Sequence, residues 1–297
     1  MPRPLYPRPR RRGAPLPSRA VLEPDTGHRI RTKIRKLPAL SASLTPVRPP
    51  DDPARHQGRV RTAPHVEGQF AAYVYVPLRL EKGAPLARLL RDVLESAKAR
   101  VPSLHPISIQ LPPGESELHI SLTRPVYLRA HQRDELKTAV RAIARAHSAF
   151  TASFAAFAEL TNDERTRTFL AVEAGAGHAE LKALSDALVP TLRLLRQKEF
   201  YSAPRFHASI AWALLDRATP GVDLPPSSSA TDTLVLNSPP PDDATARFPT
   251  IPHFPETLVQ DLNKQFGGRL VSRQTGAFQI DEVCVRIGKE VTAFKLR

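Results

Sequence analysis

The sequence predicts an α+β fold of two similar lobes, in which antiparallel sheets and flanking helices surround a central cleft. Strand-type and helix-type periodicities alternate along residues 67–297, and short turns between neighbouring strands favour antiparallel pairing. Two of the predicted strands, 118–122 and 205–214, carry the same tripeptide, His-x-Ser, 88 residues apart. In both strands apolar residues alternate with His and Ser, so one face is buried and the other is polar. We expect each lobe to contribute one of these strands to the cleft.

The first 66 residues differ from the rest in composition. They contain 13 of the 31 prolines, and their 15 Lys and Arg against 4 Asp and Glu supply most of the formal net charge of +14. They show no sustained apolar periodicity, and we expect residues 1–66 to form a disordered, basic, Pro-rich tail. The Pro-Arg-Arg-Arg-Gly stretch at 9–13 fits a nuclear-localisation signal or a loose RNA contact, and equally a solubilising tail.

The domain at 67–297 opens with a strand at 70–78, which is rich in Val, Tyr and Ala. A helix follows at 85–101, where leucines and other apolar residues recur at helical spacing. A Pro-Pro-Gly loop at 112–114 leads into the first His-x-Ser strand. A second helix, at 133–150, also has one apolar face.

The second half continues with strands at 151–160 and 166–173, joined by a polar turn, then a helix at 178–197 and the second His-x-Ser strand. Eight prolines and a Ser-Ser-Ser run mark 219–252 as an inserted loop. A helix is expected at 256–265, ended by Gly267-Gly268. Strands at 277–287 and 290–296 form a hairpin around Gly288-Lys289.

Composition excludes several classes of protein. No run of about 18 apolar residues exists, so we expect no membrane span. The single cysteine, Cys284, excludes a disulfide framework and a Cys-rich zinc site, and it is expected to be a buried small hydrophobe in an intracellular protein. Residues 67–297 carry 28 basic and 25 acidic side chains, so their net charge is nearly balanced and does not by itself indicate nucleic-acid binding.

Two histidines and two hydroxyls suit RNA cleavage without metal. The ribose 2′-OH attacks the adjacent phosphorus, one group takes its proton, and another protonates the leaving oxygen. Imidazole suits both tasks because its pKa lies near neutrality, which nominates His119 and His207. Ser121 and Ser209 can donate hydrogen bonds to the charged phosphoryl oxygens. No cluster of His, Asp and Glu has metal-ligand spacing, so we expect neither a metal nor another cofactor.

The sequence around the motifs resembles that of the U6 small nuclear RNA phosphodiesterase family, within the two-histidine phosphodiesterase superfamily. The resemblance runs from about Phe70 to the C-terminus without the 219–252 insertion. Three segments carry it: Leu-His-Ile-Ser-Leu-Thr-Arg at 118–124 with Leu-Arg-Ala-His-Gln at 128–132, Leu-Thr-Asn-Asp-Glu-Arg-Thr-Arg-Thr-Phe at 160–169, and Tyr-Ser-Ala-Pro-Arg-Phe-His-Ala-Ser-Ile-Ala-Trp at 201–212.

The resemblance implies a nuclear, monomeric 3′→5′ exoribonuclease acting on single-stranded RNA. It would trim the uridine-rich 3′ tail of U6 RNA and leave a 2′,3′-cyclic phosphate or a 3′-phosphate. His119 and His207 carry over as the acid/base pair, and Ser121 and Ser209 as the phosphate-binding hydroxyls.

Three kinds of residue have weaker assignments. Tyr201 matches a family position where an aromatic ring stacks on a base, although a half-buried core tyrosine is the plain alternative. Asn162 is a possible RNA contact. The arginines nearby are more readily explained as solvated charges: Arg124, Arg129, Arg165 and Arg167.

Two other functions remain open from sequence. Another two-histidine enzyme, such as a small-molecule cyclic phosphodiesterase or a ligase-like RNA processor, would keep the same four site residues. A non-catalytic RNA-binding module would use them only to bind phosphate. The two motifs are nearly symmetric, so the sequence does not say which histidine is the base.

Overall fold

The computed structural model describes residues 53–59, 66–81, 83–107, 109–110, 115–216 and 248–297, all within one compact unit, Pro50–Arg297. Of the expected tail, residues 1–52 and 60–65 lie outside the described residues, as does most of the expected 219–252 loop. Residues 53–59, which the sequence assigns to the tail, include a short 3-10 helix, η2 (Pro53–His56). The guanidinium of Arg59 lies 5.3 Å from the ring centroid of Trp212, so this segment packs on the domain before the expected boundary.

The strands confirm the predicted α+β class, with antiparallel pairing throughout except for one short parallel pair. In the described residues eight strands follow one another in the order β10, β6, β7, β8, β4, β1, β11, β12, and four short ones pair with β8, β4 or β1. Their bounds are β1 (Gln69–Glu81), β2 (His105–Pro106), β3 (Ile109–Gln110), β4 (Glu115–Ser121), β5 (Val126–Arg129), β6 (Phe150–Thr161), β7 (Arg167–Ala174), β8 (His207–Leu215), β9 (Thr250–Ile251), β10 (Ala277–Ile280), β11 (Glu282–Ile287) and β12 (Glu290–Lys295).

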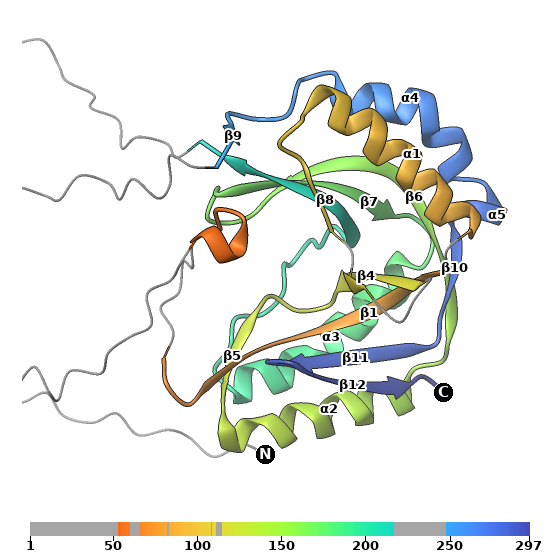
Figure 1. Ribbon diagram of the computed structural model, residues 1–297. Helices are drawn as coiled ribbons and strands as arrows, with labels where there is room; N and C mark the ends of the chain where they lie inside the picture. The colour runs from red at the N-terminus through yellow and green to blue at the C-terminus, as the bar shows by residue number, and fades with distance from the viewer. Residues whose placement is uncertain (1–52, 60–65, 82, 108, 111–114, 217–247) are drawn as a thin grey trace, which may run out of the picture. The chain divides into compact units, whose positions relative to one another are not determined.

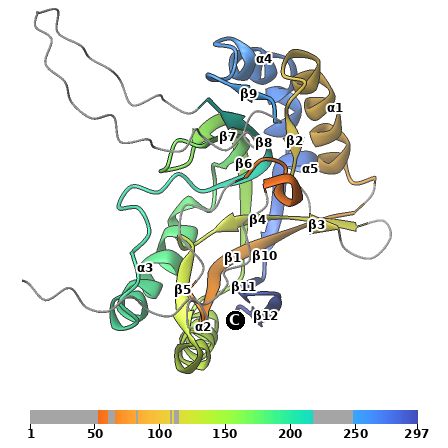
Figure 2. The same ribbon diagram turned by 60° about the vertical axis from the view of Figure 1, so that its left-hand side comes forward.

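The helices pack as two groups, one against each half of the sheet (Figures 1 and 2). In the first group α1 (Pro85–Arg100) contacts α4 (Leu258–Leu270) and α5 (Arg273–Gly276), and α4 lies on β6. In the second, α2 (Arg133–Ala146) contacts α3 (His178–Leu194), β11 and β12. No helix of the described part is long and apolar enough to cross a membrane. The two lobes meet where β8 pairs with β4.

Helix α4 corrects one expectation. It passes through Gly267-Gly268 and ends at Leu270. Leu258, Leu262, Phe266 and Leu270 are all buried at i, i+4 spacing, so the last turn packs in the core. Burying a leucine side chain stabilises the fold by about 1.5–3 kcal/mol. Each glycine inside a helix costs roughly 1 kcal/mol relative to alanine. The burial of Phe266 and Leu270 therefore offsets the cost of the two glycines.

The expected strand at 277–287 is two strands. It breaks at Asp281, so that β10 pairs with β6 in one lobe and β11 pairs with β1 and β12 in the other. The 277–296 segment thus links the lobes, and only its second half forms the expected hairpin, with Gly288 at φ 60° in the turn. Cys284 of β11 is buried as predicted, and burial raises the pKa of its thiol to about 12.

Strands β4 and β5 run one after the other along the same edge of β1. Tyr75 pairs with Ser121 and Ala72 with Val126, so two extra residues are inserted between the two ladders. There the backbone N–H of Val74 donates to the Thr123 hydroxyl, at 3.0 Å. The bulge therefore keeps its hydrogen bonds while it changes the direction of the chain beside the end of β4.

Side chains along β1 alternate between a buried face and a second face. Its even-numbered residues from 72 to 80 are buried in the core with the apolar stripe of α1. Its odd-numbered residues share the other face, and Pro77 pairs with His119 there. This second face, which carries Tyr73, Tyr75 and Pro77, is the one that holds the first His-x-Ser motif.

Candidate active site

The two His-x-Ser motifs meet at the junction of the lobes. The middle residues of the motifs, Ile120 of β4 and Ala208 of β8, form the one registered pair between these strands. Both are fully buried, so the His and Ser on either side of each project to the opposite face. Sequence reasoning placed the motifs on strands, and the structure shows that the strands are direct neighbours.

The antiparallel register sets the arrangement of the four side chains. Continuing from the Ile120–Ala208 pair, His119 lies across from Ser209, and Ser121 lies across from His207. Directly opposed residues in such a pair have Cβ atoms about 5 Å apart, and diagonal ones lie about 7–8 Å apart. The two histidines occupy one diagonal and the two serines the other. All four side chains are half-buried, which leaves them partly open to a ligand.

His207 is fixed by its own strand and by β7. Its Nδ1 lies 2.6 Å from the carbonyl oxygen of Arg205 and must donate to it, so in the neutral ring Nε2 carries the free lone pair. Glu173 pairs with His207 across the sheet and accepts a hydrogen bond from Arg205 Nε at 2.6 Å. Burial lowers the pKa of His207, while the Arg205 carbonyl and the Glu173 carboxylate oppose that shift.

His119 lies among aromatic rings. Its ring centroid is 5.7 Å from that of Tyr73 and 5.5 Å from that of Tyr75, which meets it edge to face. The Tyr75 hydroxyl donates to Glu117 at 3.3 Å. His119 Nδ1 is buried and has no hydrogen-bond partner among the described residues. Burial, then the charges of His207 and Arg286, lower the pKa of His119, and no neighbouring group raises it.

Tyr201 lies in the segment between α3 and β8. Tyr201 is 45% exposed, and the guanidinium of Arg124 lies 3.9 Å from its ring centroid. The Tyr201 hydroxyl donates to Asp163 at 2.9 Å, and Arg124 forms an ion pair with the same carboxylate. The bulge after β4, the β6–β7 turn and this segment are thus joined, and the core alternative for Tyr201 does not fit its exposure.

Asn162 organises the turn between β6 and β7. Its Oδ1 accepts from the backbone N–H groups of Thr166 and Arg167, both at 2.9 Å, and its Nδ2 donates to Glu164 and to the Thr166 hydroxyl. The amide is therefore engaged within the turn, an arrangement typical of Asn in loops. This side chain positions Asp163, and through it Tyr201.

The remaining arginines from the sequence analysis have separate positions. Arg165 lies in the same turn with φ 50°, and Arg167 lies with its guanidinium 5.3 Å from the Phe169 ring centroid. Arg129 lies on β5, away from the motifs along β1. Sequence reasoning assigned no role to Glu173, Arg205, Tyr73 or Tyr75, because only the strand register brings them beside the histidines.

Comparison with known proteins gives a consistent result. The model of the HVSL family, described as an uncharacterised conserved protein, matches residues 34–295. U6 snRNA phosphodiesterase 1 of Drosophila melanogaster is 32% identical over 200 residues, which cover 64% of this chain and 74% of that one. The Rattus norvegicus protein of the same name is 30% identical over 206 residues, which cover 68% of each chain.

A solved structure shares the fold. Kluyveromyces marxianus Usb1 with uridine monophosphate superposes with a TM-score of 0.50 at 14% identity, covering 76% of this chain and 98% of that one. At that identity the likeness concerns the fold alone.

Proposed function

We propose that this chain, which belongs to the HVSL family and to the family of U6 snRNA phosphodiesterase 1, is an RNA phosphodiesterase that processes the 3′ end of U6 small nuclear RNA. It acts as a metal-independent 3′→5′ exoribonuclease on the oligouridine tail, and it leaves a 2′,3′-cyclic phosphate or a 3′-phosphate. It works as a monomer in the nucleus. The observation that carries the proposal is the pairing of the two His-x-Ser strands at Ile120 and Ala208.

The two histidines have different environments, which supports a different role for each. Burial and the charges of His207 and Arg286 lower the pKa of His119, which favours its neutral form, so it takes the proton of the 2′-OH as general base. His207 has the Glu173 carboxylate and the Arg205 carbonyl on its side, so it is the better proton carrier and acts as general acid. The 2′-oxygen bonds to phosphorus, the bond to the 5′-oxygen breaks, and His207 protonates that oxygen.

The serines stabilise the charge that develops on the phosphorus. Ser121 and Ser209 occupy the second diagonal of the four-residue group, so a phosphate between the histidines meets one hydroxyl on either side. Fixed hydroxyl donors stabilise the charged phosphorane more than the substrate. The exposed ring of Tyr201 supplies a surface on which an RNA base stacks, with Arg124 as its cationic partner.

The direct test is end-group analysis of a 5′-labelled RNA with a uridine tail, incubated with the protein in excess EDTA. We expect products shortened one nucleotide at a time from the 3′ end. Their terminal phosphates should be removed by phosphatase, either directly or after acid opening of the cyclic form. An adenosine-tailed RNA tests base preference. Products with 3′-hydroxyl ends, or activity lost in EDTA and restored by a divalent ion, would argue for metal-dependent hydrolysis.

The pH–rate profile tests the role assignment. An acid and a base together give a bell-shaped profile whose two apparent pKa values belong to the coupled pair. Glu173 raises the pKa of His207, so Glu173→Gln should lower it and move the descending limb to lower pH. The ascending limb, set by His119, should stay in place. The measurement is kcat/KM for an oligouridine from pH 5 to pH 9, values chosen to span the roughly neutral pKa of histidine.

Asp186→Asn is the matched control, since its ion pair with Lys182 lies on the outside of α3. A shift of the ascending limb in place of the descending one would exchange the roles of the two histidines.

A further inference from the structure

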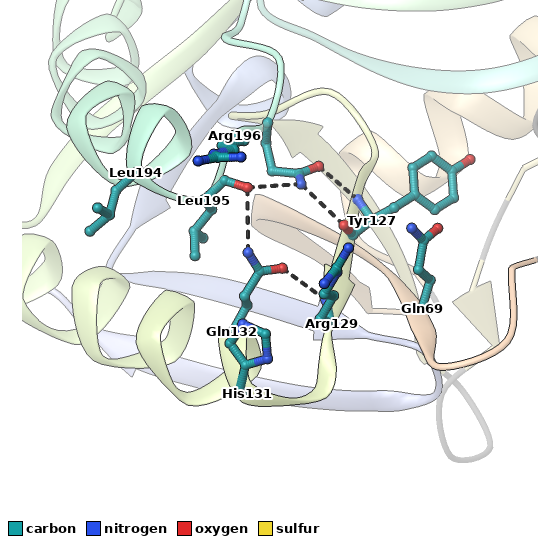
Figure 3. A pocket seen from close by; sticks show the side chains of 9 residues that line it. Gln69, Tyr127, Arg129, His131, Gln132, Leu194, Leu195 and Arg196 are labelled. Atoms are coloured by element: carbon teal, nitrogen blue, oxygen red, sulfur yellow. Dashed lines mark hydrogen bonds between the residues drawn. The ribbon is translucent and has the colours of Figure 1, made fainter.

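A second candidate binding site lies on β5, away from the histidines. A cavity of about 360 Å³ opens between β1, β5, the 3-10 helix η3 (Ala130–Gln132) and the residues that follow α3. Its polar lining includes Gln69, Tyr127, Arg129, His131 and Arg196, as Figure 3 shows. We call it the β5 pocket. Its volume is at the lower end of the range of about 300–1,000 Å³ that holds small-molecule ligands.

The wall of the β5 pocket is built from hydrogen bonds to the free edge of β5. The Gln197 side chain accepts from the Tyr127 N–H at 3.0 Å and donates to the Tyr127 carbonyl at 3.1 Å, as a neighbouring strand would. Gln197 also donates to the Leu195 carbonyl, and Gln132 Oε1 accepts from the Arg129 N–H at 2.8 Å (Figure 3). The backbone around the cavity is thus held before any ligand arrives.

The β5 pocket is positively charged. Arg129 and Arg196 are exposed, no carboxylate lines the cavity, and neither guanidinium has an ion pair within the described residues. By contrast, Arg193 on the last turn of α3 is paired with Glu199. Tyr127, 43% exposed, adds an aromatic ring beside the arginines. Cationic side chains beside an exposed aromatic ring are the combination that binds single-stranded nucleic acid.

The register of β1 connects this pocket to the histidines. Pro77 pairs with His119, and on the same face Ala71 pairs with Tyr127 and Gln69 with Arg129. The six residue steps from Pro77 to Ala71 span about 20 Å at the rise of a strand. The β5 pocket and the motif therefore share one face of the sheet, and Arg124 lies between them in the chain.

We infer that the β5 pocket binds the RNA several nucleotides away from the cleaved linkage, with Arg129 and Arg196 on its backbone phosphates and Tyr127 against a base. This inference rests on the proposed function and adds a subsite to it. RNA long enough to reach the pocket gains affinity from these contacts, whereas a dinucleotide occupies only the space between the histidines.

The test compares, by anisotropy, the binding of fluorescein-labelled diuridine and dodecauridine whose sugars are all 2′-deoxy, so that the proposed reaction cannot cleave them. We expect Arg129→Ala/Arg196→Ala to weaken dodecauridine binding roughly tenfold at low salt and to reduce the slope of log K against log salt by about 1.4, or 0.7 for each single-strand phosphate. Diuridine binding, and cleavage of all-ribose diuridine, should not change. Arg129→Lys/Arg196→Lys, which keeps both charges, should retain the wild-type slope.

Arg88→Ala/Arg91→Ala removes two exposed charges from α1, a helix whose apolar stripe packs on the core side of the sheet, and serves as the matched control. Unchanged dodecauridine binding in the pocket variant, an equal loss for both RNA lengths, or an equal loss in the control would overturn the inference. A thermal melt checks folding. Because binding is measured on RNA analogues that cannot be cleaved, a wild-type protein that binds the 2′-deoxy dodecamer but does not cleave all-ribose dodecauridine would refute the proposed function without refuting the pocket.

Discussion

Replacing His119 or His207 by alanine is expected to lower the single-turnover cleavage rate of an oligouridine by about 10²–10⁴-fold, the usual contribution of general acid or base catalysis. RNA affinity should change little, because each histidine transfers its proton only in the transition state. The two histidines occupy one diagonal of the paired strands, a spacing of about 7–8 Å between their positions on the backbone. The double variant should lose less than the product of the two single losses, because both groups act on one phosphoryl transfer.

His207→Asn makes the histidine test sharper. Asparagine can still donate a hydrogen bond toward the Arg205 carbonyl that holds His207 Nδ1, but it cannot titrate. It should therefore be as inactive as His207→Ala while it melts at the wild-type temperature. His147→Ala, at the end of α2, is the matched control and should cleave normally. Near-normal turnover by a folded His119→Ala or His207→Ala protein would refute the acid/base role of that histidine, because another group would then have to transfer the proton.

The local part of the site was predictable from sequence because a period of two specifies the face of a side chain. The alternation at 118–122 and 205–214 was enough to place each His beside its Ser on a polar face. It did not predict that β4 and β8 pair with each other, since strand pairing depends on contacts distant in the chain. The duplication of the motif predicted a cleft shared by two lobes, and it did not predict that the two strands are neighbours in one sheet.

The supporting residues were hidden for the same reason. In the sequence, Glu173 is one charged residue near the end of a predicted strand. Only the β7–β8 register shows that it lies opposite His207. Asn162 shows the opposite case, since its turn position was visible but its hydrogen bonds within the turn were not. Gly267-Gly268 predicted a helix end by propensity, and the burial of Leu270 overrode it.

A single 2′-deoxyuridine at the penultimate position of a uridine tail is expected to block release of the terminal nucleotide below detection. In the proposed mechanism that ribose supplies the attacking 2′-OH, and His119 has no other proton to remove. Intramolecular attack carries an effective molarity of about 10⁵–10⁸ M, which an attacking water does not share. Ser121 and Ser209 would still bind the phosphate, so the modified RNA should inhibit cleavage of the unmodified one.

The matched substrate carries the 2′-deoxyuridine at the terminal position only. Its terminal 2′-OH takes no part in the first cut, so this RNA should lose one nucleotide at nearly the normal rate. The two RNAs differ only in the position of one missing oxygen, and a difference between them therefore cannot come from length, charge or base. Release of the terminal nucleotide from the penultimate 2′-deoxy RNA would mean that water attacks the phosphorus, and His119 would then have to activate that water instead of the ribose.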